Sequence, residues 1–178
     1  YFFYSLSDKK DAPRISITAR LIADLLQTSG ATHVMTMTLH SPQVHGFFSV
    51  PTDPLTARGL FVHYLRKKDY NKIDTIVVSP DMGRANAAAR FADQLGLPVA
   101  AAEKARKTDD EVDISDSIIR QVKGYQRALV YDDEIATGGS VVGLSNMLVE
   151  SGMESIRLIC THGLFLGDAF ARIAAIQE

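Results

Sequence analysis

Two kinds of hydrophobic pattern alternate along the chain. Apolar residues three or four positions apart line one face of a helix. This spacing predicts helices over residues 17–26, 55–66, 83–95, 140–150 and 167–176. Short apolar runs between them predict strands over residues 33–38, 75–79, 98–102, 128–131 and 156–160. Regular alternation of strands and helices indicates an α/β fold with a mainly parallel, Rossmann-like sheet.

Two segments interrupt this alternation. Residues 50–54 contain two prolines and no clear period, which predicts a crossover between two structural units. We therefore expect one domain in residues 1–50 and another in residues 51–178. Residues 103–115 are mostly polar and predict a loop.

Composition limits the classes of function without choosing one. A chain of 178 residues that is 46% hydrophobic can bury one good core, or one core and part of another. The net charge of −2 gives no electrostatic reason to expect a nucleic acid or an anionic membrane as partner. No run of about 18 apolar residues is present to span a membrane. Cys160 is the only cysteine, which excludes an internal disulfide and fits a cytoplasmic location.

Candidate chemistry is concentrated where the strand at residues 128–131 ends. Two adjacent carboxylates, Asp132 and Asp133, follow that strand, and Thr-Gly-Gly-Ser at residues 137–140 opens the next helix. Glycines let the backbone approach an anion closely, and N–H groups at a helix start point toward it. The hydroxyls add donors, and the acids are placed to hold ribose hydroxyls or a metal ion. The pattern favours a phosphorylated sugar as ligand; the alternative is a turn with solvated acids.

Other polar residues occupy the same kind of position, just after a predicted strand. In doubly wound sheets, ligands bind beyond the carboxyl ends of the strands. We therefore expect one site to draw on the residues that follow these strands: His40, Asp81, Lys104, Asp132 and His162.

The stretch around Asp132 resembles the phosphoribosyl-diphosphate (PRPP) signature of type I phosphoribosyltransferases. Four further blocks narrow the resemblance to the ribose-phosphate pyrophosphokinases, or PRPP synthetases. They stand in the family's order: Tyr4-Ser-Leu-Ser-Asp8, Leu39-His40 with Gly46-Phe47-Phe48, Val77-Val-Ser-Pro80-Asp81-Met-Gly83, and Glu103-Lys104-Ala105-Arg106. The resemblance covers essentially the whole chain. It implies a phosphoribosyltransferase-like domain preceded by the tail of a similar domain, in an excerpt that lacks the family's N-terminal part and extreme C-terminus.

The activity implied by the resemblance is that of a ribose-phosphate diphosphokinase. This enzyme moves the diphosphoryl group of ATP to O1 of ribose 5-phosphate and gives PRPP and AMP for nucleotide biosynthesis. Mg²⁺ is the implied cofactor, and a homo-oligomer built from dimers, with hexamers as one form, is the implied assembly. Phosphoryl transfer needs positioning and positive charge where negative charge develops. The resemblance gives that catalytic role to Lys104 and Arg106, on a mobile polar loop that could close over the transferred group.

The resemblance also assigns binding roles residue by residue. The implied magnesium ligands are His40 and Asp81. The implied nucleotide-binding residues are Leu6, Ser7, Asp8 and His40. The implied substrate-binding residues are Arg106, Asp132, Asp133, Ala136, Thr137, Gly138, Gly139 and Ser140.

Three departures from the family's pattern bear on activity. Thr38 stands where the family has Asp, Ala136 replaces an acid that contacts the ribose, and Leu6-Ser7 replaces Arg-Gln. Leucine is not a conservative replacement for an arginine that contacts a nucleotide. Two alternatives therefore stay open: a weakly active or non-catalytic regulatory paralogue, and a phosphoribosyltransferase that consumes PRPP. The second alternative gives no reason for the Leu-His and Ser-Pro-Asp blocks to occur together.

Overall fold

The computed structural model describes residues 8–10, 13–68, 72–106, 112–114 and 117–177. The chain divides into two compact units, Tyr1–Ala57 and Arg58–Glu178. Among the described residues, no helix is both long enough and apolar enough to cross a membrane.

In its described residues, the first unit combines a two-stranded parallel sheet with one α-helix and one 3-10 helix. Its elements are α1 (Thr18–Thr28), β1 (Val34–Met37), η2 (Pro42–Phe47) and β2 (Thr52–Leu55). The segment predicted as a crossover therefore contains a strand that pairs with β1. Pro54 is compatible with this strand because a two-stranded sheet leaves each strand one open edge, where no N–H is needed. The side-chain oxygen of Gln27 on α1 accepts from the Val50 N–H at 3.2 Å and so ties the helix to the chain before β2.

The second unit contains a four-stranded sheet in which every neighbouring pair is parallel. Its strands, in spatial order, are β4 (Val99–Ala101), β3 (Thr75–Ser79), β7 (Arg127–Ile135) and β8 (Ser155–Gly163). The chain adds β4 on one side of β3, and later adds β7 and β8 on the other side. The direction of winding thus reverses between β3 and β7, which makes this pair the topological switch point. The predicted α/β fold with a parallel sheet is confirmed.

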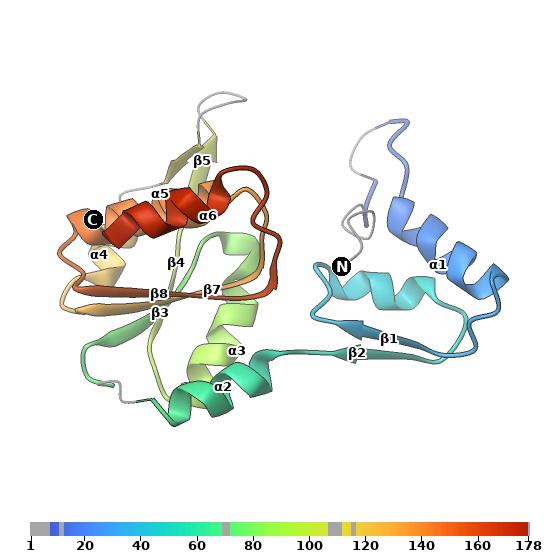
Figure 1. Cartoon of the computed structure of the whole chain (residues 1–178), viewed down its shortest axis with the longest axis horizontal. Coiled ribbons are helices and arrows are strands. Elements are labelled where there is room, and N and C mark those ends of the chain that lie inside the picture. Colours follow the sequence, from blue (N-terminus) through green and yellow to red (C-terminus); the bar gives the residue numbers. More distant parts are fainter. Residues whose placement is uncertain (1–7, 11–12, 69–71, 107–111, 115–116, 178) are drawn as a thin grey trace. The chain divides into compact units, whose positions relative to one another are not determined.

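Helices cover both faces of this sheet (Figure 1). The elements are α2 (Arg58–Arg66), η3 (Met82–Arg84), α3 (Ala85–Leu95), α4 (Ser117–Val122), α5 (Gly139–Glu150), α6 (Ala169–Ala174) and η4 (Ala175–Gln177). On one face, Phe91 of α3 packs with Val77 and Leu129 of the sheet. On the other face, Leu144 of α5 packs with Val130. Burial of apolar side chains on both faces fixes the strands, and with them the polar residues at the strand ends.

A two-stranded antiparallel hairpin interrupts the segment between β4 and α4. Its arms are β5 (Lys104–Arg106) and β6 (Val112–Ile114). The prediction of a loop throughout residues 103–115 was wrong for these arms. Each arm is only three residues long and mixes polar with apolar residues, so it produces no detectable period.

Candidate functional site

The candidate site lies at the carboxyl ends of β3 and β7, the two strands at the switch point, where doubly wound folds bind ligands. Asp81 follows β3, whereas Asp132 and Asp133 lie on β7. We expected both acids to come after the strand. They fall within it because β7 continues to Ile135, beyond the apolar run that the sequence shows.

Asp133 is held by a buried ion pair. Its side chain is 7% exposed, and its Oδ2 accepts from Nη2 of Arg84, whose side chain is 15% exposed. A buried carboxylate needs such a partner, because an unpaired charge is strongly disfavoured away from water. Sequence reasoning missed Arg84, since an ion pair between residues 49 positions apart leaves no local pattern.

Asp132 is the half-buried member of the acid pair. Its Oδ1 accepts from the Asp133 N–H at 2.8 Å. Burial is the main cause that raises the pKa of Asp132 to about 7, and the side-chain contact with Asp133 and the negative charges of Asp133 and Asp81 act in the same direction. Burial, followed by the charges of the same two β7 acids, raises the pKa of the Cys160 thiol to about 11. Because its own pKa is raised to about 7, the Asp132 carboxyl can either donate to or accept from a ligand hydroxyl near neutral pH.

The turn after β3 fixes Asp81. Its Oδ1 accepts from the Arg84 N–H at 3.0 Å and so caps η3. The Ser79 hydroxyl donates to the Asp81 carbonyl oxygen at 2.8 Å. A Cβ at Gly83 would lie only 3.2 Å from Asp81 Oδ1, so a glycine at this position lets the carboxylate keep its place. Arg84 contacts both Asp81 and Asp133, so the turn after β3 and the acid pair of β7 belong to the same region.

The loop at residues 137–140 leads from β7 into α5, as the sequence predicted. Gly138 has a φ of +76°, a conformation that side chains with a Cβ rarely adopt. The first turn of α5 contains no acidic residue, so its N–H groups retain the partial positive charge of a helix start. The Leu166 N–H donates to the Ala136 carbonyl at 2.9 Å and anchors the loop from outside. The local structure is therefore suited to an anion such as a phosphate.

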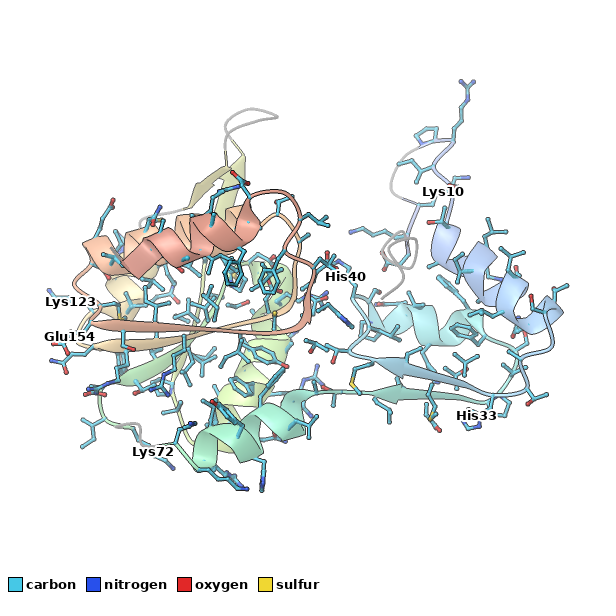
Figure 2. All side chains as sticks on the ribbon, in the orientation of Figure 1. Lys10, His33, His40, Lys72, Lys123 and Glu154 are labelled. Carbon is cyan, nitrogen blue, oxygen red and sulfur yellow. The ribbon has the colours of Figure 1, made fainter. Side chains whose placement is uncertain are left out.

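His162 lies on β8 opposite Glu134 of β7, whereas the other remaining site residues lie elsewhere or outside the described parts of the structure. Asp8 and His40 belong to the first unit, where His40 is exposed and lies at the opposite end of β1 from His33 (Figure 2). Leu6 and Ser7 lie outside the described residues. Lys104 and Arg106 are the first and last residues of β5, and their side chains fall outside the description.

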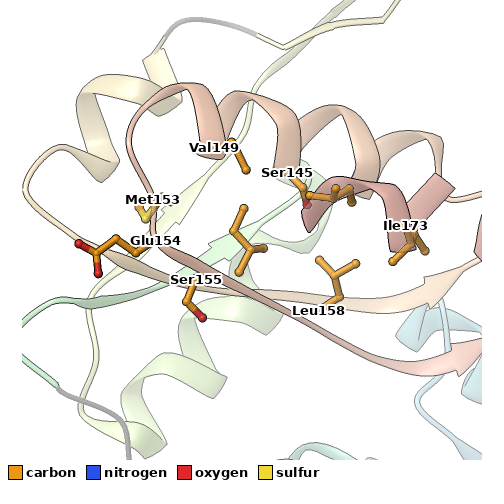
Figure 3. Close-up of a pocket in the computed structure, with 9 residues that line it drawn as sticks. Ser145, Val149, Met153, Glu154, Ser155, Leu158 and Ile173 are labelled. Carbon is orange, nitrogen blue, oxygen red and sulfur yellow. The ribbon is translucent and has the colours of Figure 1, made fainter. Parts of the chain in front are cut away.

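Two hollows of the second unit lie beside β8. One of about 440 Å³ lies between α5, β8 and the C-terminal helices, and its lining includes Ser145 and Glu154 (Figure 3). Within the described part of the chain, the buried Ser145 hydroxyl has no hydrogen-bond partner. The other, of about 670 Å³, lies between α2 and β8 and is lined mainly by apolar residues such as Phe61 and Tyr64. The lining of neither hollow includes Asp132 or the loop at residues 137–140, so converging polar groups, and not cavity size, identify the candidate site.

Comparison with known proteins supports the resemblance found in the motifs. No protein-family model matches the chain. A protein of Streptomyces coelicolor is 53% identical over 98% of the chain, which covers 54% of that relative. The ribose-phosphate pyrophosphokinase of Deinococcus radiodurans is 43% identical over 99% of the chain, which covers 55% of that relative. The crystal structure of phosphoribosylpyrophosphate synthetase from Mycobacterium smegmatis matches with a TM-score of 0.85 and 37% identity, over 98% of this chain and 55% of that one.

The chain thus spans about half the length of the relatives it matches. Along that half it is homologous to ribose-phosphate pyrophosphokinases, which confirms the resemblance.

Proposed function

We propose, from this homology and from the acid pair beside the loop at residues 137–140, that the whole protein is a ribose-phosphate diphosphokinase. The O1 hydroxyl of ribose 5-phosphate attacks the β-phosphorus of ATP and loses its proton. The bond from that phosphorus to the α,β-bridging oxygen breaks, and the products are PRPP and AMP. The observation that carries the proposal is the placement of Asp132 and Asp133 at the end of β7, directly before a helix start suited to phosphate.

The sugar phosphate is assigned to the second unit. The N–H groups at the start of α5 and the hydroxyls of Thr137 and Ser140 bind the 5-phosphate, and Gly138 and Gly139 allow its close approach. The acid pair Asp132 and Asp133 forms the part of the site that faces the ribose hydroxyls. Ala136 borders the sugar through its backbone, because its methyl group offers no hydrogen bond.

ATP and magnesium are assigned to the other predicted residues. Among the described residues, no cluster of three His, Cys, Asp or Glu side chains could hold a metal ion. Mg²⁺ fits such a chain because it binds through one or two protein groups together with waters and substrate phosphates. We assign it to Asp81 and His40, where it would neutralise charge on the triphosphate. Leu6, Ser7 and Asp8, with His40, are assigned to the nucleotide, and Leu6 contributes only apolar contact.

Lys104 and Arg106 are assigned to the transfer itself. Negative charge develops on the diphosphoryl oxygens as the bond to AMP breaks, and fixed cations stabilise that charge. Arg106 also binds the substrate phosphates through its planar guanidinium group. The proposal further includes a cytoplasmic location and a homo-oligomer built from dimers, both of which rest on the family resemblance.

The test is AMP release by the full-length protein supplied with ATP, Mg²⁺ and ribose 5-phosphate. We expect AMP and PRPP to form in equal amounts, and Lys104→Ala to lower turnover by about 10²–10³-fold, the scale of one lost preorganised charge partner. Lys123→Ala is the matched control, because Lys123 is exposed and lies before β7, at the opposite end of the sheet (Figure 2). Ribose 5-phosphate binding without AMP release would instead identify the regulatory paralogue.

A further inference from the structure

The two adjacent acids of β7 differ in their surroundings. Asp133 is 7% exposed and its carboxylate is paired with the guanidinium of Arg84. Asp132 is more exposed, and its Oδ1 accepts from the Asp133 backbone N–H at 2.8 Å. One acid is thus committed to a cation inside the fold, while the other is oriented by its neighbour's backbone and still meets solvent.

Arg84 connects the two strand ends that form the site. Its backbone N–H donates to Asp81 Oδ1 at 3.0 Å, just after β3. Its side chain reaches Asp133 on β7. The pair therefore fixes the Asp81 turn against the strand that presents Asp132. Because both partners are largely buried, removing either one takes an ion-pair partner away from a largely buried charge.

We propose that the two acids have separate roles: Asp132 contacts the sugar hydroxyls directly, whereas Asp133 and Arg84 are positioning residues that lock the carboxyl ends of β3 and β7 together. This inference rests on the proposed function and refines its sugar site. Sequence alone treats both acids as equivalent ligands of the ribose. The ion pair distinguishes them, because the Asp133 carboxylate already has a buried cationic partner.

The experiment measures binding, by calorimetry on the full-length protein, of ribose 5-phosphate and of its 2-deoxy and 3-deoxy analogues. For each analogue, the ratio of its dissociation constant to that of ribose 5-phosphate reports direct contact with the missing hydroxyl. Asp132→Asn is expected to weaken ribose 5-phosphate binding by about tenfold or more and to bring at least one ratio close to one. Arg84→Met and Asp133→Leu are each expected to weaken binding and to lower the melting temperature, while both ratios stay as in the wild type.

The double variant Arg84→Met/Asp133→Leu decides between the two roles. Removing both charges is expected to restore the melting temperature and most of the affinity, with both ratios kept. The proposal would be overturned by a stable double variant that still binds ribose 5-phosphate weakly and brings one of the two ratios close to one. Asp133 would then contact the sugar. If the double variant does not fold, Asp133→Asn serves in its place. Ratios that stay as in the wild type support the positioning role, and a ratio that falls close to one overturns it.

A matched control lies at the other end of the same strand. Arg127 on β7 pairs with Asp74, and the partners' side chains are 37% and 15% exposed. The variant Arg127→Met/Asp74→Leu should leave both ratios and the affinity unchanged. Failure of the proposed function gives a different result from failure of this inference, because wild-type protein would then bind neither ribose 5-phosphate nor PRPP.

Discussion

The two units of the chain differ most in the size of the apolar side chains that they bury. In the second unit, large side chains such as Phe91 and Leu144 are 0% exposed. In the first unit, the buried apolar residues within the described part are small: Ala19, Ala23, Val44 and Ala57. Three larger apolar residues of the first unit are more than half exposed: Leu21 at 55%, Leu25 at 52% and Met35 at 73%.

This difference shows which candidate groups rest on a self-supporting framework. Burial of apolar surface is the main stabilising contribution to a fold. Asp81, Asp132 and Asp133 lie at the ends of strands that are packed on both faces. His40 follows a strand of a two-stranded sheet in a unit whose own described core is made of small residues. The sugar site is therefore expected to survive changes that would disorganise the first unit.

Separating the units gives the largest expected effect. A chain of residues 58–178 should fold cooperatively, because its sheet has a packed core on each face. A chain of residues 1–57 should not fold alone, because it buries few large apolar side chains within its described part. Thermal unfolding followed by circular dichroism measures both, with the undivided chain as reference. A cooperative transition in residues 1–57 would remove the contrast between the units.

A pair of matched leucines sharpens the same comparison. Leu144 on α5 is 0% exposed and Leu25 on α1 is 52% exposed. Leu144→Ala should lower the free energy of unfolding by about 3 kcal/mol, through lost burial and a new cavity. Leu25→Ala should change it by no more than about 0.5 kcal/mol, as for other exposed positions. Urea denaturation of the whole chain compares them, and equal losses would mean that α1 is covered by another surface in solution.

Asp132→Asn probes the acid that the second unit buries, and its effect depends on pH. The pKa of Asp132 is raised to about 7, so the folded chain keeps a proton that the unfolded chain releases from about pH 4 upward. The stability contributed by Asp132 is thus fully present below pH 4 and is lost as the pH rises through about 7. Asparagine keeps the Oδ1 acceptor without the charge.

The Asn variant should therefore match the wild type at pH 4 and exceed it at pH 8. The expected gain is about 2 kcal/mol, since a pKa change of one corresponds to about 1.4 kcal/mol and the partial exposure of Asp132 reduces the full effect. Urea midpoints at the two pH values measure it. Asp93→Asn, at an exposed position on α3, is the control. A gain of the same size at both pH values would show that ionisation is not its cause.

Thr38→Asn tests a strained position in the first unit, with the smallest expected effect. Thr38 has a φ of +47°, which is unfavourable for a β-branched residue and better tolerated by Asn or Asp. Its N–H donates to the Leu55 carbonyl at 2.7 Å, and its hydroxyl accepts from the Ala57 N–H at 3.2 Å. Asparagine should raise the free energy of unfolding by about 1 kcal/mol. Thr36→Asn, on β1, should give no gain, and a gain there too would refute the strain interpretation.

The sequence predicted what local pattern can reveal. The strand before Asp132 and the loop at residues 137–140 were found because an apolar run, paired acids and glycines stand next to one another. Two features of the fold were missed for physical reasons. β2 was hidden because Pro51 and Pro54 suggest a break, although an open sheet edge accepts proline. The Arg84–Asp133 pair was hidden because only the packing of β3 against β7 brings its partners together. The roles of Lys104 and Arg106 remain predictions.

Gly138 brings the loop at residues 137–140 against helix α6. A Cβ at this position would lie 3.5 Å from Cδ1 of Ile173 and 3.6 Å from the Cβ of Ala169, a residue that is 0% exposed. The left-handed backbone favours glycine at position 138, and a Cβ there would be in van der Waals contact with α6. During evolution, a larger residue at position 169 would press on the loop even though it touches no ligand. We therefore expect selection for the proposed sugar-phosphate binding to extend to α6, and we expect a laboratory library that varies α6 to lose binders before it loses folded protein.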